Sequence, residues 1–363
     1  MPSRPQHFGW LVSPYSAKTR SYFAYKGIEF DDRVPGLLRL GWTIRRAVGR
    51  AIMPTVRLTD GTWLQDSSLI LDHFEACSPK PSITPSGAVQ RLASALIDLF
   101  ADEWLPMAAL HYRWSIPTNK RFALGEFANS ALPYLPRPLA LRLIRPTAAK
   151  MQSYLPLLGV TQETAPGVEE TVRQTLRAAD ETLCQHRYLL GDRPCTADFS
   201  LFGPLWAHLY RDPGTTALFD DYPALVRWMQ RLQSGSHPDI GAFLPDDRVP
   251  ASLMPLFDCI LRDQLPWIRT LVRAIDTYCE GHAGAARVPR SLGTAGFQIR
   301  GHRGERKLVT FVQWKAQRAR QAYDDSAGAA DSWLTQVGSD TPQQAIPTIA
   351  HPLKLVNFKA VLA

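Results

Sequence analysis

Three short groups of residues carry side chains that could bind and activate an anionic ligand, and the first is Ser13-Pro14-Tyr15-Ser16. This group closes an apolar run and opens a helical one, so Ser13 is expected at a helix N-terminus, where unpaired N–H groups and the helix dipole favour an anion. A thiolate there would have a lowered pKa, and the Ser13 hydroxyl would add a hydrogen bond to its charged form. Ser16 or Tyr15 could supply the hydroxyl instead. The simpler interpretation is that Ser13 and Ser16 are N-caps.

The other two groups could bind an extended peptide that has a free amino acid end. Met53-Pro54 precedes an apolar strand, and a cis bond there would present the backbone N–H and C=O of Met53 to an extended ligand. Asp66-Ser67 heads a second helix, where Ser67 could bind a carboxylate and Asp66 the ammonium group beside it. The alternatives are a proline at an edge strand and an ordinary aspartate N-cap.

The elements that must position these groups alternate between strand and helix in the first part of the chain. Hydrophobic periodicity and the hairpin signal Asp60-Gly61 predict the order β-α-β-α-β-β-α. The predicted strands are 7–12, 28–34, 55–58 and 62–65, and the predicted helices are 17–26, a basic segment within 36–50, and 67–76. This order is one way to build a mixed sheet with helices on its faces.

Beyond a proline-rich linker at 78–87, the sequence predicts helices and no further strands. The predicted helices are 88–112, 137–145, 168–187, 197–210, 222–233, 252–279 and 314–322, and the residues after 322 look loosely ordered. We therefore expect three parts: a domain at 1–82, an all-helical domain at 88–245, and a C-terminal extension at 246–363 whose role the sequence does not indicate.

Composition narrows the class of protein and its partners. The chain has 363 residues, 45% of them hydrophobic, and a net charge of +8, which favours a basic globular enzyme over a nucleic-acid-binding protein. The five cysteines are odd in number and form no C-x-x-C pair, which is typical of a reduced, cytoplasmic set. No apolar run reaches the roughly 18 residues of a membrane span, and no complete set of metal ligands stands out. We expect no nucleic acid, membrane or metal partner.

Taken in order, these motifs resemble those of the cytosolic glutathione S-transferase family over residues 7–235. Residues 13–20 (Ser-Pro-Tyr-Ser-Ala-Lys-Thr-Arg) are similar to that family's first-helix motif, with serine at the position of the activating hydroxyl. Met53-Pro54 matches the cis-proline dipeptide, and residues 66–70 (Asp-Ser-Ser-Leu-Ile) resemble the Glu/Gln-Ser-x-x-Ile motif. Residues 191–199 resemble the family's helix-capping motif, although Cys195 replaces the usual Ser or Thr and Asp66 replaces Glu or Gln.

The resemblance implies a fold, an activity and a set of site residues. The fold would be a thioredoxin-like mixed-sheet domain, an all-α domain and a mostly helical extension similar to that of larger bacterial members. The activity would be glutathione transfer to a small electrophilic, apolar substrate, with a homodimer as the assembly. The implied residues are catalytic Ser13, glutathione-binding Met53, Pro54, Asp66 and Ser67, and Arg46, Tyr15, Trp104 and His111 as contacts to the glycyl carboxylate or the second substrate. The alternative is a non-catalytic binding or assembly module with the same fold.

Overall fold

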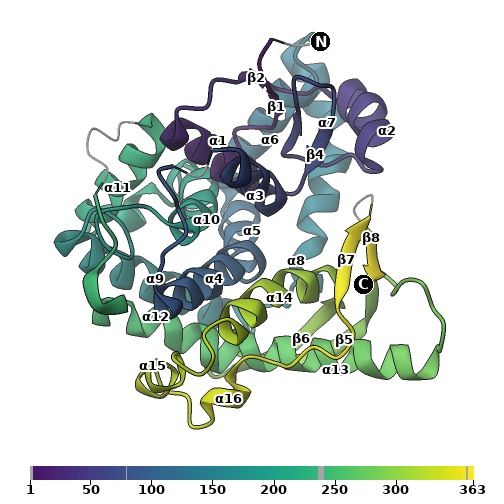
Figure 1. Cartoon of the computed structure of the whole chain (residues 1–363). Coiled ribbons are helices and arrows are strands. Elements are labelled where there is room, and N and C mark those ends of the chain that lie inside the picture. The colour runs from purple at the N-terminus through teal and green to yellow at the C-terminus, as the bar shows by residue number, and fades with distance from the viewer. Residues whose placement is uncertain (1–2, 79, 236–240, 357–358) are drawn as a thin grey trace. The chain divides into compact units, whose positions relative to one another are not determined.

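The computed structural model describes residues 3–78, 80–235, 241–356 and 359–363, so Pro79 of the predicted linker lies outside the described residues (Figure 1). The chain divides into two compact units, each assembled from three separate stretches. The first unit comprises Met1–Ile83, Ala109–Tyr154 and Asp198–Ile240, and the second comprises Thr84–Ala108, Leu155–Ala197 and Gly241–Ala363.

The first unit contains a four-stranded mixed sheet in the order β2-β1-β3-β4. Its strands are β1 (Gln6–Phe8), β2 (Asp31–Arg33), β3 (Thr55–Arg57) and β4 (Trp63–Gln65). β1 runs parallel to β2 and antiparallel to β3, and β3 pairs with β4 through the turn at Asp60-Gly61. The predicted thioredoxin-like order is confirmed, with strands shorter than the apolar runs that indicated them.

The helix α1 (Pro14–Lys26) connects the parallel strands β1 and β2. It begins with Ser13 as N-cap and proline at its first position, and it ends at Gly27, whose φ of 64° terminates the helix in the left-handed region. Buried Phe23 packs edge-on against Phe74 of α3 (Ser67–Cys77), with ring centroids 4.8 Å apart. This packing fixes α1 and α3 against each other.

The basic segment between β2 and β3 is helical, as predicted. It consists of the π-helix η1 (Arg39–Ile44) and the short α2 (Arg45–Val48). Ile44 and Val48 are buried and pack against Phe8 of β1, whereas most of the segment's arginines point to solvent. Ile44 and Val48 therefore attach this helical segment to the sheet, and its solvent-facing side is basic.

Helices complete the first unit, and of these α6 and η3 fall at positions where the sequence predicted none. They are the part of α5 (Pro106–Ser115) from Ala109 onward, α6 (Pro117–Ala131), α7 (Arg137–Gln152), most of α10 (Thr196–Pro204), η2 (Leu205–Tyr210), η3 (Thr216–Phe219) and α11 (Pro223–Ser234). The single helix predicted at 88–112 is wrong: it is two helices, α4 (Ala88–Glu103) and α5. Pro106 explains the break, because a proline inside a helix removes a hydrogen bond and clashes with the preceding turn.

The second unit combines α4 with the C-terminal part of the chain. Its other helices are α9 (Ala165–Gln185), η4 (Pro245–Asp247), η5 (Ala251–Leu253), α12 (Met254–Cys259), η6 (Ile260–Gln264), α13 (Leu265–Gly281), α14 (Phe311–Asp324), α15 (Asp331–Gln336) and α16 (Pro342–Ala345), and the short α8 (Tyr154–Leu157) begins at the unit boundary. The unit also contains two β-hairpins, β5 (Ser291–Ile299)–β6 (His302–Val309) and β7 (Leu353–Val356)–β8 (Lys359–Leu362). Buried Lys315 of α14 donates to Asp102 of α4 at 2.6 Å and joins the two ends of the unit.

The two hairpins correct the expectation that strands end with the first domain. Glycines and charged side chains interrupt the apolar alternation along β5 and β6, so the period of two that marks a strand is weak there. The β5–β6 turn is made by Arg300 (φ 47°) and Gly301 (φ 85°), a pair outside the usual Asn-Gly and Asp-Gly signals. The described residues after 322 include α15, α16 and the β7 and β8 strands, which corrects the expectation of a loosely ordered end.

Candidate functional site

The sheet topology brings the three predicted groups to one edge of the first unit. Thr55, at the start of β3, pairs with both Phe8 and Gln65, the last residues of β1 and β4. Because β1 and β4 both run opposite to β3, these three strand ends lie at the same edge. Met53-Pro54 comes just before β3, Asp66-Ser67 just after β4, and Ser13 five residues after β1.

Ser13 caps α1 and is half-buried. Its Oγ accepts a hydrogen bond from the Ser16 N–H at 3.2 Å, so the hydroxyl lies at the first turn of the helix. Ser16, the alternative hydroxyl, is fully buried. A Cβ added at Gly9 would lie 2.4 Å from Ser16 Oγ, which shows that the backbone of the β1–α1 loop covers this side chain. Of the two serines, only Ser13 reaches solvent.

Two arginines hold the carbonyl groups of the loop that precedes Ser13. Arg20 of α1 donates to the carbonyl oxygens of Gly9 at 2.8 Å and Trp10 at 3.2 Å, and it forms a two-pronged ion pair with Asp32. Arg113 of α5 donates to the Val12 carbonyl at 3.0 Å. The residues before Ser13 are therefore tied to both α1 and α5.

Arg113 belongs to a buried network that sequence reasoning missed. Its guanidinium binds both carboxylate oxygens of Asp212, at 2.7 and 2.8 Å, and donates to the Ala207 carbonyl at 2.7 Å. The imidazole Nε2 of His208 also donates to the Val12 carbonyl, at 3.0 Å. Burial, and next the charge of Arg113, lowers the pKa of His208 well below its usual range, so the ring is neutral at physiological pH. The sequence signal was an arginine within the apolar run 107–114 of α5.

Met53-Pro54 and Asp66-Ser67 have the local structure expected of them. The Met53-Pro54 peptide bond is cis. Asp66 is the N-cap of α3, and its Oδ1 accepts from the N–H groups of Ser68 at 2.8 Å and Leu69 at 3.3 Å. Its φ of 70° with ψ of 131° is sparsely populated for a non-glycine residue and costs about 1–3 kcal/mol, a strain that clusters at functional sites. Asp66 therefore heads α3, as predicted, and acts as its N-cap.

A buried lysine adds positive charge behind this edge. Lys18 of α1 is fully buried, and its Nζ lies 3.4 Å from Ser68 Oγ, one residue beyond Ser67. The ammonium group and the N-terminus of α3 together favour an anion at Ser67. Sequence reasoning missed Lys18 because a lysine in a helix more often marks the solvent face.

The four remaining candidate residues differ in their exposure and in the unit to which they belong. Tyr15 is half-buried on α1, and Arg46 is exposed on α2. His111 is nearly buried on α5, with its Nδ1 3.2 Å from Ser115 Oγ. Trp104 belongs to the second unit, where it is 1% exposed and lies under the Arg306 guanidinium, 4.8 Å from its ring centroid. The structure thus does not place Trp104 in the same unit as the other three.

The capping motif around Cys195 is completed by a residue from another helix. The Ala197 N–H, in the first turn of α10, donates to Ser94 Oγ of α4 at 3.2 Å. Ser94 thereby supplies a hydroxyl of the kind that the replaced Ser or Thr would have provided. Asp198 accepts a hydrogen bond from Trp228 Nε1 at 2.9 Å and ties α10 to α11.

Comparison with known proteins agrees with these motifs. Two family models match: the glutathione S-transferase N-terminal domain over residues 12–77 and the C-terminal domain over residues 138–234. The chain belongs to the glutathione S-transferase family. No curated protein matches it.

Similar solved structures are distant. The β-etherase LigF from Sphingobium sp. strain SYK-6 is 19% identical, with 64% of this chain and 95% of that chain covered and a TM-score of 0.44. A glutathione S-transferase from Rhodospirillum rubrum F11 is 19% identical, covering 68% and 96%, with a TM-score of 0.41. Glutathione transferase GSTFuA3 from Phanerochaete chrysosporium is 16% identical, covering 66% and 100%, with a TM-score of 0.46. At these scores we draw nothing from the individual structures.

Close packing beside Ser13 leads to a first prediction. A Cβ added at Gly203 of α10 would lie 2.6 Å from the carbonyl oxygen of Pro14, the residue after Ser13. We expect Gly203→Ala to push α1 and α10 apart and to lower the free energy of unfolding by about 1–3 kcal/mol, measured by denaturant titration. Gly41→Ala, in η1 with open space at the Cβ position, is the matched control and should leave stability unchanged or higher. Equal stability of the two variants would contradict the close approach.

Proposed function

We propose that the protein is a glutathione transferase that activates the bound thiol through Ser13. The observation that carries this proposal is the meeting of two helix N-termini at one sheet edge: that of α1 with a solvent-accessible serine, and that of α3 with Asp66-Ser67 and buried Lys18. The membership of the glutathione S-transferase family supports the choice of ligand.

Each group has a role that its chemistry suits. The hydroxyl and N–H of Ser67 bind the γ-glutamyl carboxylate, and the Asp66 carboxylate binds the neighbouring ammonium group. The backbone of Met53 pairs with the extended peptide, and Arg46 is the proposed partner of the glycyl carboxylate. These contacts place the cysteinyl sulfur at Ser13, at the N-terminus of α1.

The reaction is a displacement or an addition at an electrophilic carbon. The thiol loses its proton to solvent because the α1 N-terminus and the Ser13 hydroxyl stabilise the thiolate. The sulfur lone pair then forms the C–S bond, and either a leaving group departs with its electron pair or the electrophile's π bond takes up the pair and is protonated. The protein supplies no covalent nucleophile of its own.

Calorimetric titration with reduced glutathione tests the binding half of the proposal. We expect saturable binding in the wild type, and a loss of affinity of roughly tenfold or more in Ser67→Ala, because a hydrogen bond to a charged group contributes about 1.5–3 kcal/mol. Ser130→Ala on α6 is the control and should bind as the wild type does. Absence of saturation at millimolar glutathione would refute the transferase and favour the non-catalytic module. Binding without turnover of any electrophile would keep the site and remove the reaction.

A further inference from the structure

Apart from Leu11, the large exposed apolar side chains of the first unit gather in two segments. Seven of the ten large apolar side chains that stand exposed among the described residues fall within residues 34–42 and 134–143. These seven are Val34, Leu38, Trp42, Tyr134, Leu135, Leu139 and Leu143. We call the surface that they share with the flanking basic residues of 34–50 and 127–152 the basic-apolar surface.

The two segments touch each other. A Cβ added at Gly36 would lie 3.2 Å from the Ala131 carbonyl oxygen and 3.9 Å from Pro133, at the connection between α6 and α7. The Trp10 indole donates to the Pro35 carbonyl at 2.8 Å, and its ring lies 5.5 Å from that of Phe127 on α6. Residues 35–36, just before η1, therefore lie against the end of α6 and its connection to α7, and Figure 1 labels α2, α6 and α7.

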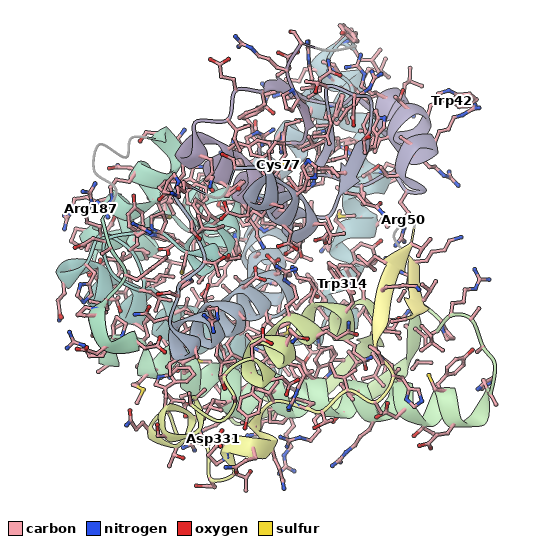
Figure 2. All side chains as sticks on the ribbon, viewed as in Figure 1. Trp42, Arg50, Cys77, Arg187, Trp314 and Asp331 are labelled. Atoms are coloured by element: carbon pink, nitrogen blue, oxygen red, sulfur yellow. The ribbon has the colours of Figure 1, made fainter. Side chains whose placement is uncertain are left out.

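Three of the seven apolar side chains on this surface project strongly into solvent. Tyr134 is 97% exposed, Leu38 is 89% exposed and Trp42 is 73% exposed, so little of the protein packs around them. Figure 2 shows Trp42 pointing away from α2 into solvent. Leu139 and Leu143 add an exposed pair at i, i+4 spacing on α7, beside the buried stripe of Ala140, Ile144 and Ala148. Side chains that project singly suit a soft medium into which they insert better than a rigid partner with matching pockets.

The charged side chains of the basic-apolar surface are all positive. Residues 34–50 and 127–152 contain eight arginines and lysines and no aspartate or glutamate. They are Arg39, Arg45, Arg46, Arg50, Arg137, Arg142, Arg145 and Lys150. A twofold contact between two copies would place this surface against itself, because such an interface is formed by the same patch on both subunits, and like charges would meet. An anionic partner is complementary.

We propose that the basic-apolar surface docks on an anionic lipid bilayer. Tryptophan, tyrosine and leucine side chains insert at the level of the headgroups, and arginine and lysine bind the lipid phosphates and carboxylates. This contact lies on the surface of the bilayer. It is compatible with the finding that no helix in the described part of the chain is long and apolar enough to span a membrane. It revises the expectation of no membrane partner, which rested on spanning segments alone. The proposal does not depend on glutathione binding.

Vesicle co-sedimentation of the full-length protein tests the proposal. We expect binding to phosphatidylglycerol-rich vesicles at low salt, release when salt is raised to about ten times that concentration, and no binding to phosphatidylcholine vesicles. Leu38→Ser/Trp42→Ser should weaken binding at least tenfold, through lost apolar insertion. Arg142→Gln/Arg145→Gln should weaken it roughly fivefold for each arginine. All four positions are exposed, and circular dichroism should show that both double variants are folded.

A matched control separates this surface from apolar exposure in general. Val356 of β7 is 48% exposed and lies in the second unit, so Val356→Ser should bind vesicles as the wild type does. Absence of binding to anionic vesicles, equal binding to neutral ones, or unchanged binding by Leu38→Ser/Trp42→Ser would each overturn the proposal. Sedimentation velocity provides a further outcome: a dimer that Leu38→Ser/Trp42→Ser abolishes would show that a second copy covers the surface, and it would also overturn the proposal.

Discussion

Arg113→Met should lower the free energy of unfolding by about 3–5 kcal/mol, because it leaves the Asp212 carboxylate buried without its cation. The side chain of Arg113 is 2% exposed and that of Asp212 is 1% exposed, so water cannot replace the lost hydrogen bonds. The carbonyl groups of Val12 and Ala207 also lose a donor. Denaturant unfolding of the two proteins at neutral pH measures the difference.

The double variant Arg113→Met/Asp212→Leu separates a buried unpaired charge from a general packing defect. Apolar side chains often replace a buried ion pair at little cost, so we expect this variant to recover most of the stability that Arg113→Met loses. Its glutathione affinity and turnover then report what the Val12 carbonyl contact contributes to the position of Ser13. A loss below about 1 kcal/mol in Arg113→Met would show that the pair behaves like a solvent-exposed one and would contradict the buried geometry.

Ser13→Ala should reduce turnover most strongly at low pH. If the hydroxyl and the helix N-terminus together lower the pKa of bound glutathione by about two units, losing the hydroxyl's share moves the thiolate titration back toward the usual thiol pKa. Below the wild-type pKa the rate should then fall by up to about 100-fold, and well above it the two enzymes should converge. The pH profile of kcat/KM with an aryl halide, together with thiolate absorbance in the binary complex, measures the shift.

Two further variants isolate the role of the Ser13 hydroxyl. Ser13 is also the N-cap of α1, and removing a cap costs about 0.5–2 kcal/mol of stability. Ser13→Thr keeps both the cap and the hydroxyl, so it should restore the pH profile. Ser16→Ala alters a fully buried hydroxyl and should leave the profile in place. A profile that moves in Ser16→Ala and not in Ser13→Ala would transfer the role to Ser16.

The local structure around Ser13, Met53 and Asp66 could be predicted because these residues sit at the ends of strands and helices. Once the order β-α-β-α-β-β-α is assigned, Ser13, Met53 and Asp66 follow one another around a single sheet edge. Local signals also place them: proline after Ser13, glycine in the hairpin, and an aspartate heading α3. The positions of these three residues depend only on local structure and sheet topology, which the order of the motifs indicates.

The network that holds the β1–α1 loop could not be predicted in the same way. Arg113 and Asp212 are 99 residues apart, and no periodicity or motif links an arginine on one helix to an aspartate after another. The same holds for Lys18 with Ser68 and for Ser94 with Ala197. Such partners are set by how helices pack, a tertiary property that hydrophobic pattern constrains only in outline.

The order in which the second unit is synthesised has a consequence for the growing chain. Asp98 and Asp102 of α4 are 4% and 3% exposed in the finished protein, and Lys315 reaches Asp102 from 213 residues farther along. At about 5–20 residues per second, the ribosome takes roughly 10–40 s to produce that lysine after α4 has emerged. During this interval Asp98 and Asp102 lack the cations of α14, so we expect their carboxylates to remain hydrated. The second unit is therefore completed only after α14 has left the ribosome.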